Sequence, residues 1–74
     1  MSLGVATGVV TSFDAERGLG VVRADDGREH PFHCTQIADG SRHIDVGTRV
    51  TFEVRAGHRG QWEAAAITPL LQTS

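Results

Sequence analysis

The sequence predicts an all-β protein, a small barrel of five short antiparallel strands. With 74 residues the chain is long enough for one compact domain, which we assign to residues 5–70, with 1–4 and 71–74 as flexible termini. Runs rich in Val, Thr and Phe alternate with turns that contain Gly and Asp. A long connection follows the third run, and no segment has a strong helical pattern. These three observations favour a small antiparallel barrel.

The first two strands and the hairpin turn after them have clear local signals. Residues 5–13 are rich in Val and Thr, which favour a pleated, half-buried surface, and we assign Val10 to the core. The second strand is predicted over residues 18–24, where the alternation of Gly with apolar residues lets a ligand or another backbone approach one face. The turn at Asp25-Asp26-Gly27-Arg28 joins it to the third strand.

The third strand is short and is followed by the longest loop. It is predicted over residues 30–33, and because Pro31 cannot donate to a ladder, we expect an edge strand. Residues 35–46 show no alternation and at most one helical turn. We assign Ile37 and Ile44 to the interior, where they anchor this loop.

The fourth strand is predicted from alternation, whereas the residues alone leave a helical turn open within the last, because Ala64-Ala65-Ala66 has helix propensity. The fourth strand opens at Gly47, and every second residue over 50–54 is apolar, which gives one apolar and one polar face. The last strand is predicted over residues 61–67, with Ala65 and Ile67 directed inward.

The composition restricts the classes of function. The formal net charge is −2, and all seven basic residues are Arg, so the chain lacks the excess of positive charge typical of proteins that hold duplex DNA through its phosphates. A single Cys excludes an internal disulfide, and we find no apolar run long enough for a signal peptide or a membrane span. We therefore expect a cytoplasmic protein with no membrane partner.

Histidine and cysteine are the natural candidates for metal binding or catalysis, and strand geometry argues against both. Three of them are clustered at His30, His33 and Cys34, and His43 and His58 lie in loops. His30 and His33 are predicted to point to opposite faces, and His33 and Cys34 to face apart, so neither a zinc site nor a Cys–His pair is expected. We interpret the histidines as solvated and Cys34 as a small apolar filler.

The paired carboxylates are assigned to turns. Asp25-Asp26 and Asp14-Ala15-Glu16 have no apolar pocket around them that would raise a pKa. We therefore predict that the protein is not an enzyme and uses no cofactor, metal ion or small-molecule substrate.

Two motifs resemble those of the cold-shock domain family. Residues 17–22, Arg-Gly-Leu-Gly-Val-Val, correspond to its first ribonucleoprotein-type motif, usually K-G-F-G-F-I. Residues 30–34, His-Pro-Phe-His-Cys, correspond to its second, usually V-F-V-H-F. The resemblance runs from Gly8 to Leu70 and implies the five-stranded OB-fold of the cold-shock type, which binds single-stranded nucleic acid.

The chain departs from the family at the aromatic positions of the binding face. The glycines and His33 are retained, but Ser12 stands in place of the family's Trp, and its Phe residues are replaced at Leu19, Val21, Pro31 and Cys34. Stacking on an aromatic ring contributes about 1–3 kcal/mol per base, so the resemblance implies weakened binding. The Trp62 ring is predicted either to replace the lost stacking platform or to cover the core as a lid.

The expected function is passive, weak binding of single-stranded RNA or DNA with little sequence preference. The residues assigned to this interface are Phe13, Arg17, Leu19, Val21, Pro31, His33 and Trp62. If His33 contacts the ligand, its protonation tightens binding as the pH falls through about 6.5. The alternative is that the apolar replacements make this face a surface for protein interaction or self-association, with a homodimer as the product.

Overall fold

The computed structural model describes residues 2–57 and 62–70 and has the predicted all-β architecture. The elements are β1 (Ser2–Asp14), β2 (Leu19–Ala24), β3 (Glu29–His33), the 3₁₀ turn η1 (Cys34–Gln36), β4 (Arg49–Ala56) and β5 (Trp62–Pro69). The five strands are antiparallel neighbours in the order β3-β2-β1-β4-β5. In this described part of the chain, no helix has the length and apolar character needed to cross a membrane.

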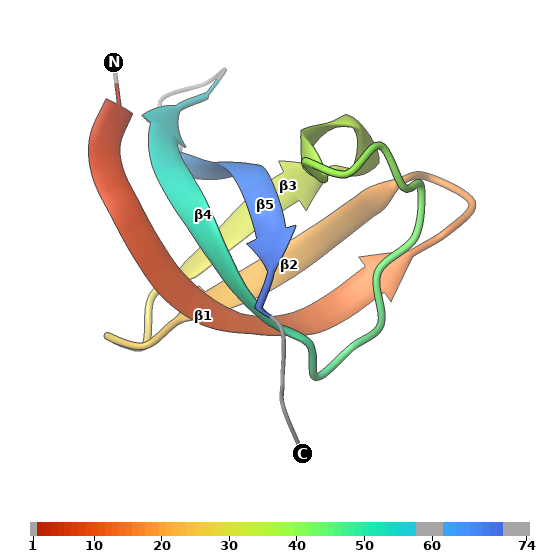
Figure 1. Ribbon diagram of the computed structural model, residues 1–74, viewed down its shortest axis with the longest axis horizontal. Helices are drawn as coiled ribbons and strands as arrows, with labels where there is room; N and C mark the ends of the chain where they lie inside the picture. The colour runs from red at the N-terminus through yellow and green to blue at the C-terminus, as the bar shows by residue number, and fades with distance from the viewer. Residues whose placement is uncertain (1, 58–61, 71–74) are drawn as a thin grey trace.

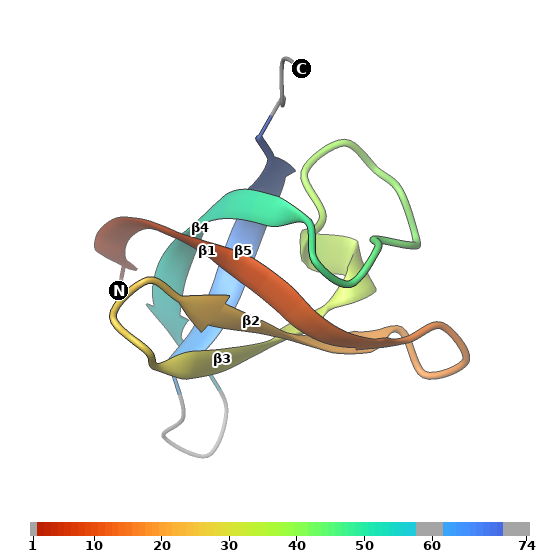
Figure 2. The same cartoon turned by 90° about the horizontal axis from the view of Figure 1, so that it is seen from below.

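Strand β1 is the centre of the sheet. It is long and strongly curved, and it pairs with β2 on one side and with β4 on the other (Figure 1). A view turned by 90° shows β1, β2 and β3 together, with β5 crossing behind them (Figure 2). The end strands β3 and β5 also contact each other, so the curved sheet wraps around one core.

Except at the beginning, the strand boundaries agree with the sequence prediction to within two residues, since β4 begins at Arg49 and not at Gly47 and β5 extends to Pro69. Strand β1 begins at Ser2, which pairs with Arg55 of β4, so residues 2–4 belong to a strand and not to a terminus outside the domain. Strand β3 lies at one end of the strand order, as expected from Pro31. The predicted flexible residues 71–74 lie outside the described residues.

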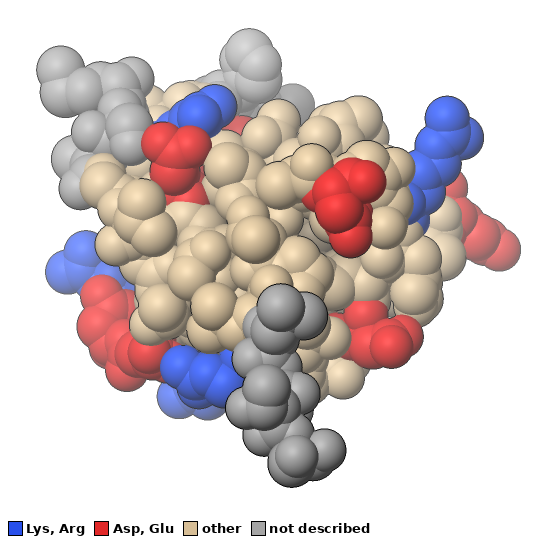
Figure 3. Space-filling model, in the orientation of Figure 1, with Lys and Arg blue, Asp and Glu red and all other residues tan. Residues whose placement is uncertain are grey.

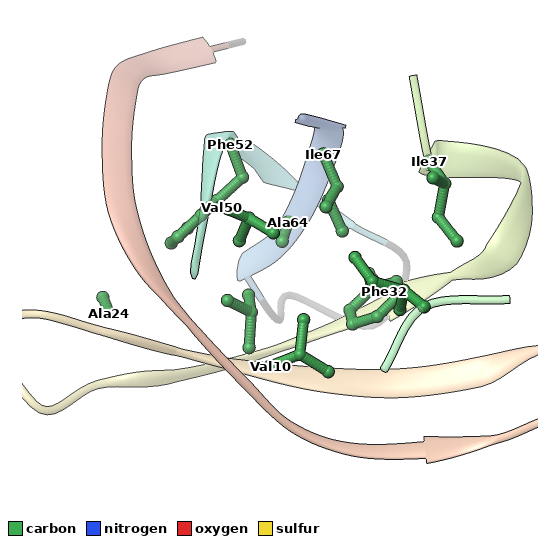
Figure 4. Packing of buried hydrophobic residues seen from close by; sticks show 10 residues of the cluster. Val10, Ala24, Phe32, Ile37, Val50, Phe52, Ala64 and Ile67 are labelled. Atoms are coloured by element: carbon green, nitrogen blue, oxygen red, sulfur yellow. The ribbon is translucent and has the colours of Figure 1, made fainter. Parts of the chain in front are cut away.

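The core is built from one face of every strand together with the two loop anchors (Figure 4). Val10, Val22, Val50, Phe52 and Ile67 are at most 1 % exposed. Full burial of such a side chain contributes about 1.5–3 kcal/mol. The inward assignments of the sequence analysis are confirmed, since Ile37, Ile44 and Ala65 are also buried.

A bulge in β1 changes which side chains face the core. Val10 of β1 pairs with Val22 of β2. The neighbouring residue of β2, Val21, pairs with Ser12, so Thr11 of β1 has no partner in β2 and is an extra residue. Its hydroxyl donates to the Val21 carbonyl oxygen at 3.3 Å. Simple alternation from Val10 would turn Phe13 outward, whereas the extra residue turns it inward.

The turn between β2 and β3 is fastened to two other strands. The Thr7 hydroxyl donates to the Asp25 carboxylate, and the Arg49 guanidinium lies 3.2 Å from it. The Thr7 hydrogen bond and the Arg49 charge lower the pKa of Asp25 below its ordinary value of 3.8. Gly27 adopts φ 91° in this turn, a conformation that favours glycine.

Candidate functional site

The outward side chains of β1, β2 and β3 form two rows across the strands. Ser12 lies opposite Val21, which lies opposite Pro31. In the next outward row, Leu19 lies between Asp14 and His33. We call this surface the outer face.

The outer face contains a groove of about 540 Å³. It is lined by Ser12, Leu19, Gly20, Val21, Pro31, Phe32, His33 and Glu63. Apolar groups make up most of this lining, and Leu19 is 48 % exposed. The groove thus offers an accessible apolar floor with a few polar side chains.

The structure brings together only part of the predicted interface. The four predicted residues on β2 and β3 line the groove: Leu19, Val21, Pro31 and His33. The other three, Phe13, Arg17 and Trp62, are not part of its lining. Each lies elsewhere for a specific reason.

Phe13 lies on the inner face, which corrects its assignment to the binding face. It pairs with Gly20, which pairs with Phe32, and the two Phe rings stack with centroids 6.1 Å apart. A Cβ at Gly20 would be too close to the Phe32 ring, so glycine makes room for this stack. His43 covers the other part of Phe13 in an edge contact at 5.4 Å. The β1 bulge is the cause, because it reverses the direction of Phe13.

Arg17 lies in the turn between β1 and β2 and extends into solvent. Its guanidinium Nε is 3.8 Å from a carboxylate oxygen of Asp14, and its side chain is 78 % exposed. An exposed pair of this kind contributes little to stability. Arg17 is therefore near the Leu19 and His33 row without lining the groove.

His33 is held by the backbone that follows it. Its Nδ1 accepts from the Thr35 amide at 3.2 Å and lies 3.0 Å from the Thr35 hydroxyl. When Nδ1 accepts from an amide, the neutral ring carries its proton on Nε2. The exposed His33 thus presents an N–H donor at the groove.

His30 is buried, which corrects its interpretation as a solvated histidine. It pairs with Val22 on the inner face and is only 7 % exposed. Its Nδ1 lies 3.3 Å from the Trp62 carbonyl oxygen, and its ring packs against Phe52. Alternation places His30 and His33 on opposite faces, and the core occupies the His30 side.

Cys34 does not face away from His33 as predicted. Strand β3 ends at His33 and Cys34 begins η1, so strand alternation does not apply, and Cys34 Sγ lies 3.9 Å from His33 Nδ1. The side chain is half-buried and packs against the core. Within residues 2–57 and 62–70 no three His, Cys, Asp or Glu side chains are placed to hold a metal ion, and His58 lies outside these residues.

Trp62 is exposed, and its neighbour Glu63 enters the groove instead. Trp62 begins β5 and is 43 % exposed, more than a lid over the core would be. Glu63 points to the opposite side of this strand and lines the groove beside residues of β2 and β3. The sequence analysis missed Glu63, although alternation against Trp62 was a signal for it.

On the face seen in Figure 3, the described residues form no continuous basic surface. In the view of Figure 3, Arg side chains lie next to acidic ones around the rim. Within residues 2–57 and 62–70, four arginines form ion pairs with Asp or Glu: Arg17, Arg28, Arg49 and Arg55. Because these arginines are paired and the net charge is −2, few positive charges are left for a ligand. The groove can therefore bind a ligand mainly through apolar contacts.

Comparison with known proteins identifies similar sequences over nearly the whole chain. The "'Cold-shock' DNA-binding domain" family matches residues 6–70. The cold shock-like protein CspE of Bacillus anthracis is 38 % identical over 55 residues, which cover 73 % of this chain and 82 % of CspE. The cold shock protein ScoF of Streptomyces coelicolor is 37 % identical over 67 residues, which cover 88 % of this chain and 98 % of ScoF. The major cold shock protein of Streptococcus pyogenes serotype M1 is 34 % identical over 67 residues, which cover 89 % of this chain and 98 % of that protein.

Proposed function

The chain belongs to the cold-shock domain family, and on this basis we propose that it binds single-stranded RNA or DNA in the groove of the outer face. The observation that carries the proposal is the groove itself. Six of its eight described lining residues belong to the two segments that correspond to the family's ribonucleoprotein-type motifs, and the groove is open and largely apolar. Unpaired bases expose flat apolar faces that fit such a surface.

Each part of a bound strand has a matching group in the groove. Base faces lie on Leu19 and Pro31, which are exposed, and on Val21, which is half-buried. The Nε2 proton of His33 donates to a phosphate or base oxygen. Binding of this kind keeps a strand unpaired and requires no bond to be made or broken, so we propose a passive binder that acts in the cytoplasm and not an enzyme.

We expect the affinity to be low and the sequence preference small. Among the described residues that line the groove, none offers an exposed Phe, Tyr or Trp ring, and stacking on such a ring would contribute about 1–3 kcal/mol per base. Paired arginines leave few cations for phosphates, and each phosphate contact contributes a slope of about −0.7 to the salt dependence of single-strand binding. The dissociation constant should therefore lie toward the millimolar range and change little with salt.

Trp62 remains a proposed additional platform at the margin of the groove. Its ring is 43 % exposed, and the next residue, Glu63, lines the groove. Trp62 and Glu63 lie on opposite sides of β5, so a ligand would reach the ring only by bending around the beginning of this strand. Because Trp62 is the only Trp in the chain, quenching of its emission reports this contact directly.

The test is a titration with heptathymidine and heptauridine, whose length lies within the range that one OB-fold covers. We expect the NMR signals of Leu19, Val21 and His33 to shift in a saturable way at both about 50 and 200 mM salt. Shifts confined to residues outside the groove, or no shift up to about 1 mM protein, would overturn the proposal.

A competing function is self-association through the same face. The observation in its favour is that Leu19 is 48 % exposed in a groove with few polar groups. Light scattering over a range of protein concentrations distinguishes the two functions. A mass that doubles with concentration, together with no response to oligonucleotides, would favour the homodimer.

A further inference from the structure

Glu63 is the unexpected component of the groove. Among the described residues that line it, Glu63 is the only acidic one, and Ser12 and His33 are the other polar side chains. A carboxylate repels phosphates and can only accept hydrogen bonds. It is therefore suited to a part of the ligand that donates, which in a nucleic acid is a base edge.

The Glu63 side chain lies beside the end of β4. It is half-buried, and its Cγ, Cδ and Oε2 lie over Gly57, where an added Cβ would displace this flexible carboxylate end. Arg55 lies opposite Glu63 in the β4–β5 ladder, but its guanidinium binds Glu53 at 2.8 Å. None of the ion pairs within residues 2–57 and 62–70 includes Glu63, so its oxygens can accept from a ligand.

The bases differ in what they offer to a carboxylate. In a single strand the Watson–Crick edge is unpaired and open to contact. Guanine presents the N1–H and N2–H donors side by side, which matches the two oxygens of a carboxylate. Thymine and uracil present one N–H between two carbonyl oxygens, which the carboxylate repels. Adenine and cytosine should be intermediate between guanine and thymine or uracil in their match to a carboxylate, because each presents one amino group beside an acceptor nitrogen.

We propose that Glu63 is a specificity-determining residue that selects guanine over thymine or uracil at one position of the bound strand. This inference rests on the proposed binding of single-stranded nucleic acid in the groove. His33 and Glu63 then have complementary tasks. His33 donates to oxygens of the strand, and Glu63 accepts from a base.

The experiment compares three heptanucleotides: heptathymidine and its variants with deoxyguanosine or deoxyinosine at the central position. Inosine keeps N1–H but lacks the 2-amino group. A well-placed two-bond contact to a base contributes about 1–3 kcal/mol, so at this open site we expect deoxyguanosine to tighten binding about fivefold over heptathymidine. The affinity for the deoxyinosine variant should lie between the affinities for these two oligonucleotides.

Two variants identify the side chain responsible. Glu63→Gln removes the charge and keeps the shape, and we expect its preference for deoxyguanosine to fall below about twofold. Glu29→Gln is the matched control, because Glu29 is an exposed acidic residue of β3 that does not line the groove. It should retain the full preference, and NMR spectra of both variants should show a folded sheet.

The outcomes separate this inference from the function beneath it. Equal binding of the three oligonucleotides, or an unchanged preference in Glu63→Gln, overturns the role of Glu63 and leaves the proposed function intact. Failure of the unmodified protein to bind any of them overturns the proposed function and this inference with it.

Discussion

The inner and outer faces of β1, β2 and β3 are made by alternate residues of the same three strands, yet their chemistry differs. The inner face holds two stacked phenylalanines and a buried histidine, whereas the outer face holds short aliphatic groups, a proline and an exposed histidine. On the inner face these residues are Val10, Phe13, Val22, His30 and Phe32; on the outer face they are Ser12, Leu19, Val21, Pro31 and His33.

This difference indicates that fold and recognition depend on separate sets of side chains. The chain retains both motifs of its family. On the outer face, however, non-aromatic side chains stand where the family has aromatic ones. Such replacement does not involve Phe32 and Val22, which belong to the core and face the other side of the sheet. Affinity can therefore change while the barrel persists.

The largest effect should come from the inner face. Phe32→Ala removes a ring that is only 3 % exposed and stacks with Phe13, so we expect a loss of about 3–5 kcal/mol in the free energy of unfolding, measured with urea. Phe32→Leu keeps most of the volume and should lose less. An unfolding free energy within about 1 kcal/mol of the unmodified protein for Phe32→Ala would contradict the division between the faces.

A smaller effect is expected from adding a ring to the outer face. Leu19→Phe places an aromatic side chain in the groove, where stacking should strengthen oligonucleotide binding by about 1–3 kcal/mol and leave the melting temperature nearly unchanged. Val46→Phe is the control, because Val46 is 62 % exposed and does not line the groove. If both variants gain equally, the outer face is not the binding surface.

The smallest effect should come from the hairpin turn, which belongs to neither face. The Thr7 hydrogen bond and the nearby Arg49 lower the pKa of Asp25 below 3.8, so the charged form stabilises the folded state. This stabilisation is present above pH 3.8 and is lost as the pH falls through the lower, folded-state pKa.

Asp25→Asn should therefore melt slightly earlier than the unmodified protein at neutral pH, and the difference should shrink below pH 3.8. Melting curves followed by circular dichroism across this range measure it. Oligonucleotide affinity at neutral pH should not change. A difference in melting temperature that grows in acid would contradict the assigned sign.

Local patterns were sufficient to predict most of the fold. Alternation and turn residues identified the first four strands, the family resemblance favoured a strand over a helical turn at residues 64–66, and Pro31 identified an edge. The extra residue Thr11 was not predictable, because a bulge leaves no mark in a run of Val, Thr and Ser. The beginning of β1 at Ser2 was also missed, since it depends on pairing with Arg55, far along the chain.

The candidate site was predictable only where it is local. Leu19, Val21, Pro31 and His33 lie on one hairpin, and alternation places them on one face. Phe13 was misassigned because the bulge reverses its direction. Alternation against Trp62 indicates only the side of β5 on which Glu63 lies; its place in the groove depends on the contact of β5 with β3, which local patterns do not predict.

The contact between β3 and β5 also bears on aggregation. These are the end strands of the sheet, and the backbone of an exposed end strand is a template for pairing with a second chain. Here the His30 ring is 3.3 Å from the Trp62 carbonyl oxygen, and the Ala38 amide donates to the Ile67 carbonyl oxygen at 2.8 Å. Pro31 in turn offers no amide proton to an incoming strand. The described edges thus cover each other in part, which protects a chain of 74 residues from the strand addition that leads to fibrils.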